Sequence, residues 1–158
     1  MPVELLHLYR APGHSFAGRH GQPPLDIPMV EVDALECVAG RGLVGDRYFD
    51  RKPDYKGQIT FFAWETHQDL CRQLNTPDRP PWVYRRNVIT RGVDLNAWIG
   101  VEFEIQGVRF AGTEEARPCY WMNTAVGPGA EDLLQGRGGL RARILSPGTL
   151  RRTATAPA

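Results

Sequence analysis

Cys119 is the residue whose type and surroundings best suit chemistry. It follows Pro118, which fixes the backbone locally and removes a hydrogen-bond donor, so we expect the thiol to lie in a shaped loop. The charged residues Glu114, Glu115 and Arg117 precede it. Cys37 and Cys71 fall beside an expected strand and on the apolar face of an expected helix, where a cysteine usually acts as a small buried hydrophobe. Cys119 is therefore the candidate nucleophile or metal ligand.

A second candidate is the cationic pair Arg85 and Arg86, followed by Asn87, just ahead of an expected strand. Two guanidinium groups can clamp a phosphate or carboxylate through paired hydrogen bonds. The alternative is a solvated strand end with no ligand. Composition does not choose between these interpretations.

The segment from Gly40 to Gly45 matches the GxGxxG pattern of dinucleotide-binding folds. Such a fold requires a helix to begin there, so that its N-terminus can hold the pyrophosphate. The following residues 46–53 lack helical periodicity and end at a proline, so the sequence does not support this interpretation. Asp46 and Arg47 also stand where a phosphate-binding loop would have Lys and Ser or Thr.

His67 lies on the apolar face of a helix expected over residues 64–74. A core histidine with its hydrogen bonds satisfied explains this position better than a ligand does. No Cys/His spacing predicts a structural zinc site, and no GxSxG motif predicts a serine nucleophile.

Apolar residues alternate with polar ones in several short runs, which predicts half-buried strands. These runs are 3–9, 30–34, 58–62, 87–90, 101–105, 108–110 and 140–144, with hairpin turns at 106–107 and 147–148. A second short helix is expected over 129–134, a long loop over 11–28 and a frayed tail over 153–158. The pattern predicts a β-rich, mostly antiparallel, barrel-like fold with a few short peripheral helices, in a single domain over residues 1–158.

The formal net charge of +1 argues against broad binding of nucleic acid or of an anionic membrane. Arginine accounts for 17 of the 19 basic residues, which suits phosphate binding but also follows from a GC-rich genome. The N-terminal run is interrupted by Glu4 and His7, so it predicts neither a signal peptide nor a membrane span. The odd number of cysteines makes a disulfide framework unexpected and favours a cytoplasmic location.

Taken in order, several segments resemble the MOSC domain family, named for the C-terminal region of molybdenum-cofactor sulfurases. The resemblance covers residues 30–150. It is carried by Gly42 to Arg47, Arg85 to Thr90 with Gly92, Asp94 and Leu95 after it, Gly100 to Ile105, Pro118-Cys119 and Gly138 to Leu140.

The resemblance implies that the chain binds the pyranopterin molybdenum cofactor, with Cys119 as the metal ligand. A thiolate suits this soft, oxo-bearing metal centre. Arg47, Arg85 and Arg86 would bind the cofactor phosphate and Asn87 would orient a neighbour. Gly45 and Asp46 complete the cofactor-binding set. Pyridoxal phosphate is not expected, because the only two lysines, Lys52 and Lys56, lie in a loop rich in proline and glycine.

Three functions follow from the resemblance. The first is a reductase that removes oxygen from N-hydroxylated substrates, with electrons from a separate flavin or iron–sulfur protein. The second is a sulfur-carrier or cofactor-handling module that forms a persulfide on Cys119. The third is a non-catalytic domain that binds an anion near Arg85 and Arg86. The sequence leaves the oligomeric state open.

Overall fold

The computed structural model describes residues 3–12 and 29–153. Its strands are β1 (Glu4–Arg10), β2 (Val30–Val32), β3 (Ala34–Val38), β4 (Gly42–Leu43), β5 (Ile59–Ala63), β6 (Val88–Arg91), β7 (Glu102–Ile105), β8 (Val108–Glu115), β9 (Leu140–Ile144) and β10 (Gly148–Arg151). Its helices are α1 (Trp64–Leu74), α2 (Trp121–Ala125) and α3 (Ala130–Leu133), with 3-10 turns η1 (Pro81–Tyr84) and η2 (Leu95–Trp98).

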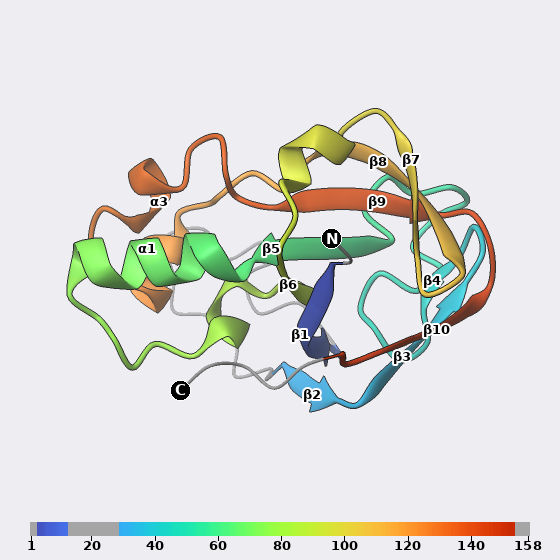
Figure 1. The fold of residues 1–158 in the computed structure, drawn as a ribbon, viewed down its shortest axis with the longest axis horizontal. Coiled ribbons are helices and arrows are strands. Elements are labelled where there is room, and N and C mark those ends of the chain that lie inside the picture. The colour runs from blue at the N-terminus through green and yellow to red at the C-terminus, as the bar shows by residue number, and fades with distance from the viewer. Residues whose placement is uncertain (1–2, 13–28, 154–158) are drawn as a thin grey trace.

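The strands form two sheets (Figure 1). The larger has the order β2-β1-β6-β5-β9-β8-β7, and the smaller has the order β10-β3-β4. Neighbouring strands are antiparallel except for β5 and β6, which are parallel. The expected β-rich, mostly antiparallel class is therefore confirmed. The larger sheet ends in the edge strands β2 and β7, so the barrel-like description holds only loosely.

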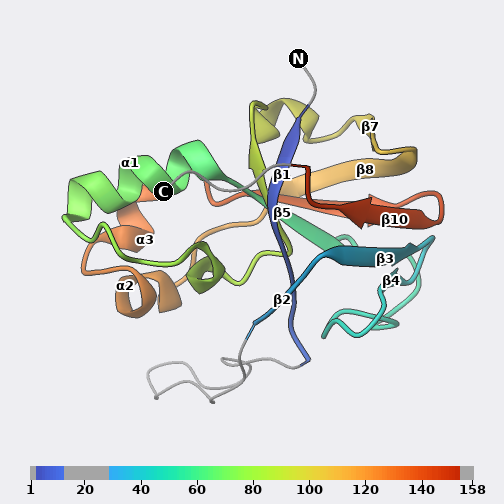
Figure 2. The same ribbon diagram turned by 60° about the horizontal axis from the view of Figure 1, so that its bottom comes forward.

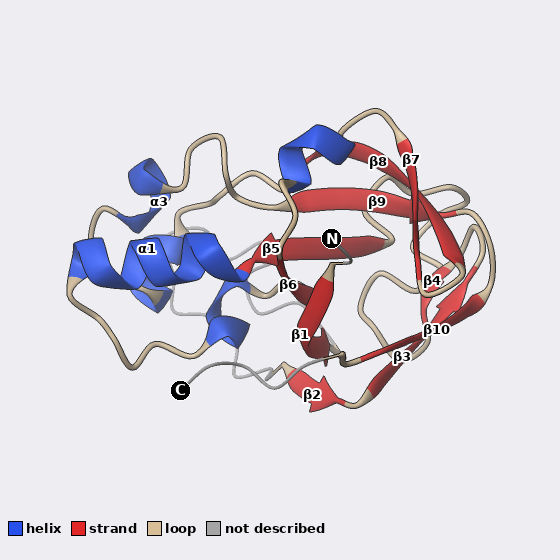
Figure 3. Ribbon diagram, in the orientation of Figure 1, coloured by secondary structure: helices blue, strands red, loops and turns tan. Residues whose placement is uncertain are grey.

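The helices α1, α2 and α3 gather at one end of the molecule, beyond the strands (Figures 2 and 3). Helix α1 spans the residues that the apolar periodicity predicts and ends at Leu74. The next residue, Asn75, caps the helix with the left-handed backbone typical of this position. The single strand expected over 30–34 is divided at Asp33 into β2 and β3, which belong to different sheets. The loop and tail expected over 11–28 and 153–158 lie mostly outside the described residues.

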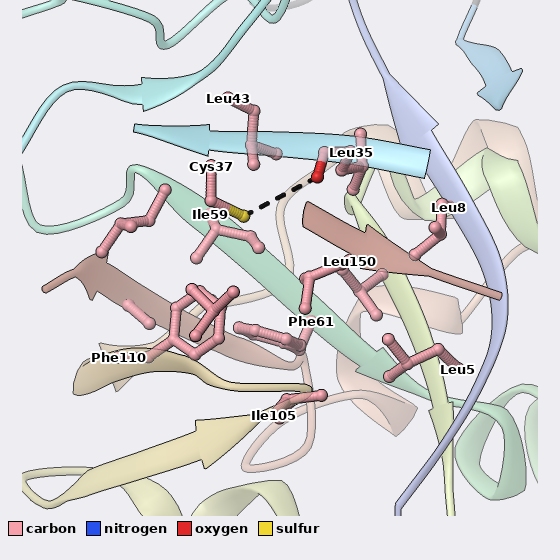
Figure 4. Packing of buried hydrophobic residues seen from close by; sticks show 14 of the residues in the cluster. Leu5, Leu8, Leu35, Cys37, Leu43, Ile59, Phe61, Ile105, Phe110 and Leu150 are labelled. Carbon is pink, nitrogen blue, oxygen red and sulfur yellow. Dashed lines mark hydrogen bonds between the residues drawn. The ribbon is translucent and has the colours of Figure 1, made fainter. Parts of the chain in front are cut away.

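Two apolar cores share the central strands. Phe61 packs in the core between the sheets, near Phe110 and Ile105 (Figure 4), whereas the next residue, Phe62, packs in the core beneath the helices. Leu8 and Tyr9 of β1 are divided in the same way. Successive side chains of a strand point to opposite faces, so a strand covered on both faces is apolar throughout. Strand β5 is accordingly buried on both faces from Ile59 to Phe62, with Thr60 as its polar residue, and it leads directly into α1.

No helix within the described residues has the length and apolar content needed to cross a membrane.

Candidate functional site

Cys119 lies in the short loop between β8 and α2. Its side chain is exposed, whereas Cys37 and Cys71 are buried. The backbone carbonyl of Cys119 accepts a hydrogen bond from the Met122 amide at 2.9 Å, in the first turn of α2. Of the three cysteines, Cys119 is therefore the one exposed at the surface.

Arg86 holds this loop in place. Its Nη2 donates to the Ala116 carbonyl at 2.9 Å and its Nε donates to the Gly138 carbonyl at 3.1 Å. Its Nη1 donates to the carbonyl of Tyr84 at 3.0 Å. Burial lowers the pKa of the Arg86 guanidinium to about 10, and the nearby Cys119 group acts in the opposite direction. Arg86 thus remains a cation at neutral pH and joins three chain segments beside Cys119.

Gly138 makes the close approach of these segments possible. A Cβ at this position would lie 2.3 Å from the carbonyl oxygen of Ala116 and 2.8 Å from Cδ of Pro118. The Gly138 amide also donates to the Glu115 carboxylate at 3.0 Å. A side chain at residue 138 would therefore displace the loop that carries Cys119.

A cavity of about 200 Å³ opens beside Cys119. It is lined by five arginines together with aromatic residues, Met122 and Cys119 itself, and none of these residues is a carboxylate. The arginines come from four segments of the chain: Arg47, Arg85 and Arg86, Arg117, and Arg141. Such a lining has a strong positive potential and suits an anion.

Arg47 and Arg85 form the pair on one wall of the cavity. Nη2 of Arg47 donates to the Arg85 carbonyl at 3.1 Å. Arg85 is only 8% exposed and has a left-handed backbone (φ 58°) at the end of η1. Burial lowers the pKa of Arg85 to about 10, and the charge of Arg47 lowers it further. An anion placed between the two guanidinium groups would relieve this repulsion.

Asp46 and Asn87 lie behind the cavity. The Asn87 side-chain amide donates to Oδ1 of Asp46 and to the Tyr9 carbonyl, each at 3.1 Å. Its side-chain oxygen accepts from the Thr60 amide at 2.9 Å. Asp46 also accepts from the amide of Ala11 at 2.9 Å. These contacts fix the turn from which Arg47 extends.

Gly45 begins the same turn with a φ of +82°. A Cβ at this position would lie 2.7 Å from Nη1 of Arg10. Of the residues predicted from the sequence, the structure therefore brings Arg47, Arg85, Arg86 and Cys119 together around one cavity. Gly45, Asp46 and Asn87 support that cavity without lining it.

Sequence reasoning did not single out Arg117, Arg141, Tyr48 or Trp121, which also line the cavity. Arg117 could have been found, because it lies two residues before Cys119. Arg141 alternates with buried residues of β9, which marks it as outward-facing without indicating a ligand. Trp121 lies in α2, a helix too short to show an apolar period.

The sequence-based interpretation of His67 agrees with the structure. Its Nδ1 lies 2.7 Å from the hydroxyl of Tyr84, and burial lowers the pKa of His67 to about 4. A larger cavity of about 580 Å³ is lined by His67, Cys71 and Trp64 among others. Within the described residues, no group of three or more His, Cys, Asp or Glu side chains is placed to hold a metal ion.

Together, the fold and the cavity define a strand-rich domain in which an accessible cysteine stands among arginines. The model of the MOSC domain family matches residues 32–154. The chain belongs to the MOSC domain family, which is associated with binding of the molybdenum cofactor.

Solved structures share the fold. The YUAD protein from Bacillus subtilis matches with a TM-score of 0.71 at 19% identity, over 96% of this chain and 92% of that chain. YiiM from Escherichia coli matches with a TM-score of 0.65 at 18% identity, over 95% of this chain and 64% of that chain. YiiM from Geobacillus stearothermophilus matches with a TM-score of 0.70 at 13% identity, over 98% and 73%. No curated protein sequence matches the chain.

Proposed function

We propose that the chain binds the molybdenum cofactor at the arginine-lined cavity, with the Cys119 thiolate as a ligand of the metal. The observation that carries this proposal is the accessible thiol at a cavity with five arginines and no carboxylate. A thiolate is a soft ligand, and a phosphate requires fixed cations. The donor set therefore fits both the metal-bearing and the phosphate-bearing part of the cofactor.

The size of the cavity limits what it can hold. Pockets that enclose a drug-sized ligand usually measure about 300–1,000 Å³, whereas this cavity measures about 200 Å³. It accordingly suits one end of a cofactor better than a whole pyranopterin. Arg47 and Arg85 would bind the phosphate, while Arg86 would hold the loop of Cys119 in place.

As the reaction, we propose reduction of an N-hydroxylated substrate. The bound cofactor would supply the two-electron chemistry that breaks the N–O bond, with two protons consumed and water released. The electrons would come from a separate flavin or iron–sulfur protein. The protein's own residues would bind the substrate, orient it and provide the charged surroundings of the reacting bond.

The test is anaerobic reduction of a simple N-hydroxylated amidine with an artificial electron donor. We expect turnover by the wild-type protein and none by Cys119→Ser, because a hydroxyl is a harder and far less acidic ligand than a thiol. Cys71→Ser is the matched control, since this thiol is buried away from the cavity, and it should stay active per folded molecule. Full activity of Cys119→Ser would refute the proposed role of the thiol.

The exposure of Cys119 also favours a second candidate, the sulfur carrier. A transient persulfide requires a thiol that a partner can reach. In that case, mass spectrometry of the freshly purified protein would find the Cys119 peptide heavier by one sulfur atom. Loss of the extra mass on mild reduction, without any amidine reduction, would favour the carrier over the reductase.

A further inference from the structure

The cations around Cys119 are not equivalent. Nε, Nη1 and Nη2 of Arg86 donate to backbone carbonyls, and Nη1 of Arg141 lies 3.4 Å from the Glu114 carboxylate. Arg47 and Arg85 repel one another on one wall and suit a single anion, the cofactor phosphate in the proposed function. Arg117 is the one arginine of the cavity to which none of these roles is assigned.

Arg117 lies in the same loop as Cys119, between β8 and α2. Its side chain is exposed and lines the cavity, and its guanidinium makes no hydrogen bond or ion pair within the described part of the chain. Its charge reaches Glu114, but that carboxylate already lies 2.9 Å from the Lys56 ammonium. Arg117 is therefore available to a molecule that approaches Cys119.

The rim of the cavity adds further cations. The Arg47 and Arg51 guanidinium carbons lie 4.9 Å and 5.9 Å from the centre of the Tyr48 ring. That ring is 5.5 Å from the Tyr55 ring, over which the Lys52 ammonium lies at 5.5 Å.

Two carboxylates, Asp50 and Asp54, lie in the same segment as Arg51 and Lys52. Asp50 forms an ion pair with Arg41. Because cationic side chains outnumber free carboxylates here, the rim attracts anions over a distance of about one Debye length.

We infer that the molecule which reacts beside Cys119 carries an acidic group, a carboxylate or a phosphate, and that Arg117 binds this group. The inference rests on the proposed function for the identity of the reaction. The binding of an anion by Arg117 can be tested without it.

The first test uses the full-length chain prepared without cofactor and two alkylating reagents of similar size. Iodoacetate is an anion and iodoacetamide is neutral, and both replace iodide with the thiolate sulfur. We expect the ratio of the two rates at Cys119 to exceed the ratio at a cysteine in a short peptide by about tenfold, since a charge-assisted contact has about this effect. Higher ionic strength should lower the ratio.

Variants assign the effect to Arg117. Arg117→Gln should reduce the ratio several-fold and Arg117→Glu should reduce it further. Arg109→Gln is the matched control, because Arg109 pairs with Glu102 at the far end of β8 and should leave the ratio unchanged. An equal ratio in wild type and Arg117→Gln would overturn the inference.

The second test uses the molybdenum-loaded protein and three N-hydroxylated benzamidines: unsubstituted, carboxylated and phosphorylated on the ring. We expect kcat/KM to favour one or both anionic substrates by about tenfold, and we expect Arg117→Gln to abolish that preference. The two anionic substrates distinguish a carboxylate site from a phosphate site.

The failures of the two proposals are distinguishable. Equal kcat/KM for all three substrates would overturn the inference while the proposed function stands. Absence of any reduction would overturn the proposed reaction, and the alkylation ratio alone would then decide whether Arg117 binds an anion.

Discussion

At the scale of single residues, the three cysteines differ in burial, and this difference determines which thiol is suited to bind a metal. Burial raises the pKa of Cys37 to about 12 and also raises the pKa of Cys71, so both remain thiols at neutral pH. Metal binding requires the thiolate. Cys119 is the exposed cysteine and lies beside fixed cations, so it is the one suited to bind a metal.

Serine substitutions should therefore lower stability at the two buried cysteines and leave it almost unchanged at Cys119. Cys37→Ser places a hydroxyl in the apolar core between the sheets, and Cys71→Ser buries one beside His67. Each should lower the free energy of unfolding by about 1–3 kcal/mol. Cys119→Ser should change it by less than about 0.5 kcal/mol, as is usual at an exposed site. Denaturant unfolding measures all three. A loss of stability in Cys119→Ser as large as in Cys37→Ser would contradict the exposed position of the Cys119 side chain.

His67 should make stability depend on pH. Burial lowers its pKa from 6.5 to about 4 in the folded chain, so between these values the unfolded chain binds a proton that the folded chain does not. The free energy of unfolding should accordingly fall as the pH falls through this window, by at most about 3 kcal/mol from His67 alone. His67→Gln should lack this component. If the free energy of unfolding varied with pH in the same way in the wild type and in His67→Gln, this pH dependence would not come from His67.

At the scale of elements, the loop that carries Cys119 is shaped by segments distant in sequence. The Ala116 amide donates to the carbonyl of Gly139 at 2.9 Å, which continues the pairing of β8 with β9. Arg86 and Gly138 then hold the next residues in place. The position of Cys119 thus depends on β9 and on the segment before β6.

Gly138→Ala should displace this loop. The added methyl would meet the backbone at Ala116 and the ring of Pro118, neither of which is the flexible end of a side chain. We expect a loss of about 1–3 kcal/mol in stability and reduced molybdenum content. Gly127→Ala is the control, because its Cβ would find ordinary contacts of 3.6–3.9 Å. Equal thermal melts and equal metal content in the two variants would contradict this description of the loop.

Arg86→Ala should free the loop from its neighbours. It leaves the carbonyls of Tyr84, Ala116 and Gly138 without their guanidinium donor and should cost about 2–4 kcal/mol. Arg86→Lys should restore only part of this, because a point charge cannot reproduce the planar fork. Hydrogen exchange at the Met122 amide reports the loop directly. Unchanged exchange in Arg86→Ala would show that other contacts hold the loop.

At the scale of the whole molecule, the shared central strands couple the two cores. Phe61 and Phe62 are adjacent in β5 but pack in different cores, so neither core can lose its packing without disturbing this strand. Denaturant unfolding followed by tryptophan fluorescence and by far-ultraviolet circular dichroism should therefore give coincident single transitions. Two separated transitions would show that the sheet end and the helical end are independent.

Local patterns predicted much of this fold. The alternation in 140–144 and the apolar period in 64–74 both became the expected elements, because each depends on residues close in sequence. Sheet closure depends on contacts between distant strands, and the open edges at β2 and β7 were not predictable from alternation. For the site, Cys119 and the three arginines nearest the motifs were found from the sequence. The bonds from Arg86 to three separate carbonyls were not, since they require the assembled fold.

The molybdenum content of the full-length chain, purified from a host that makes the cofactor, tests the central claim most directly. We predict about one molybdenum per chain in the wild type and the same value per folded molecule in Cys37→Ser. Cys119→Ser should retain far less metal, because it lacks the thiolate ligand but keeps the fold. Absence of molybdenum and pterin from the wild type, or equal metal content in Cys119→Ser, would contradict the assignment of Cys119 as the cofactor ligand.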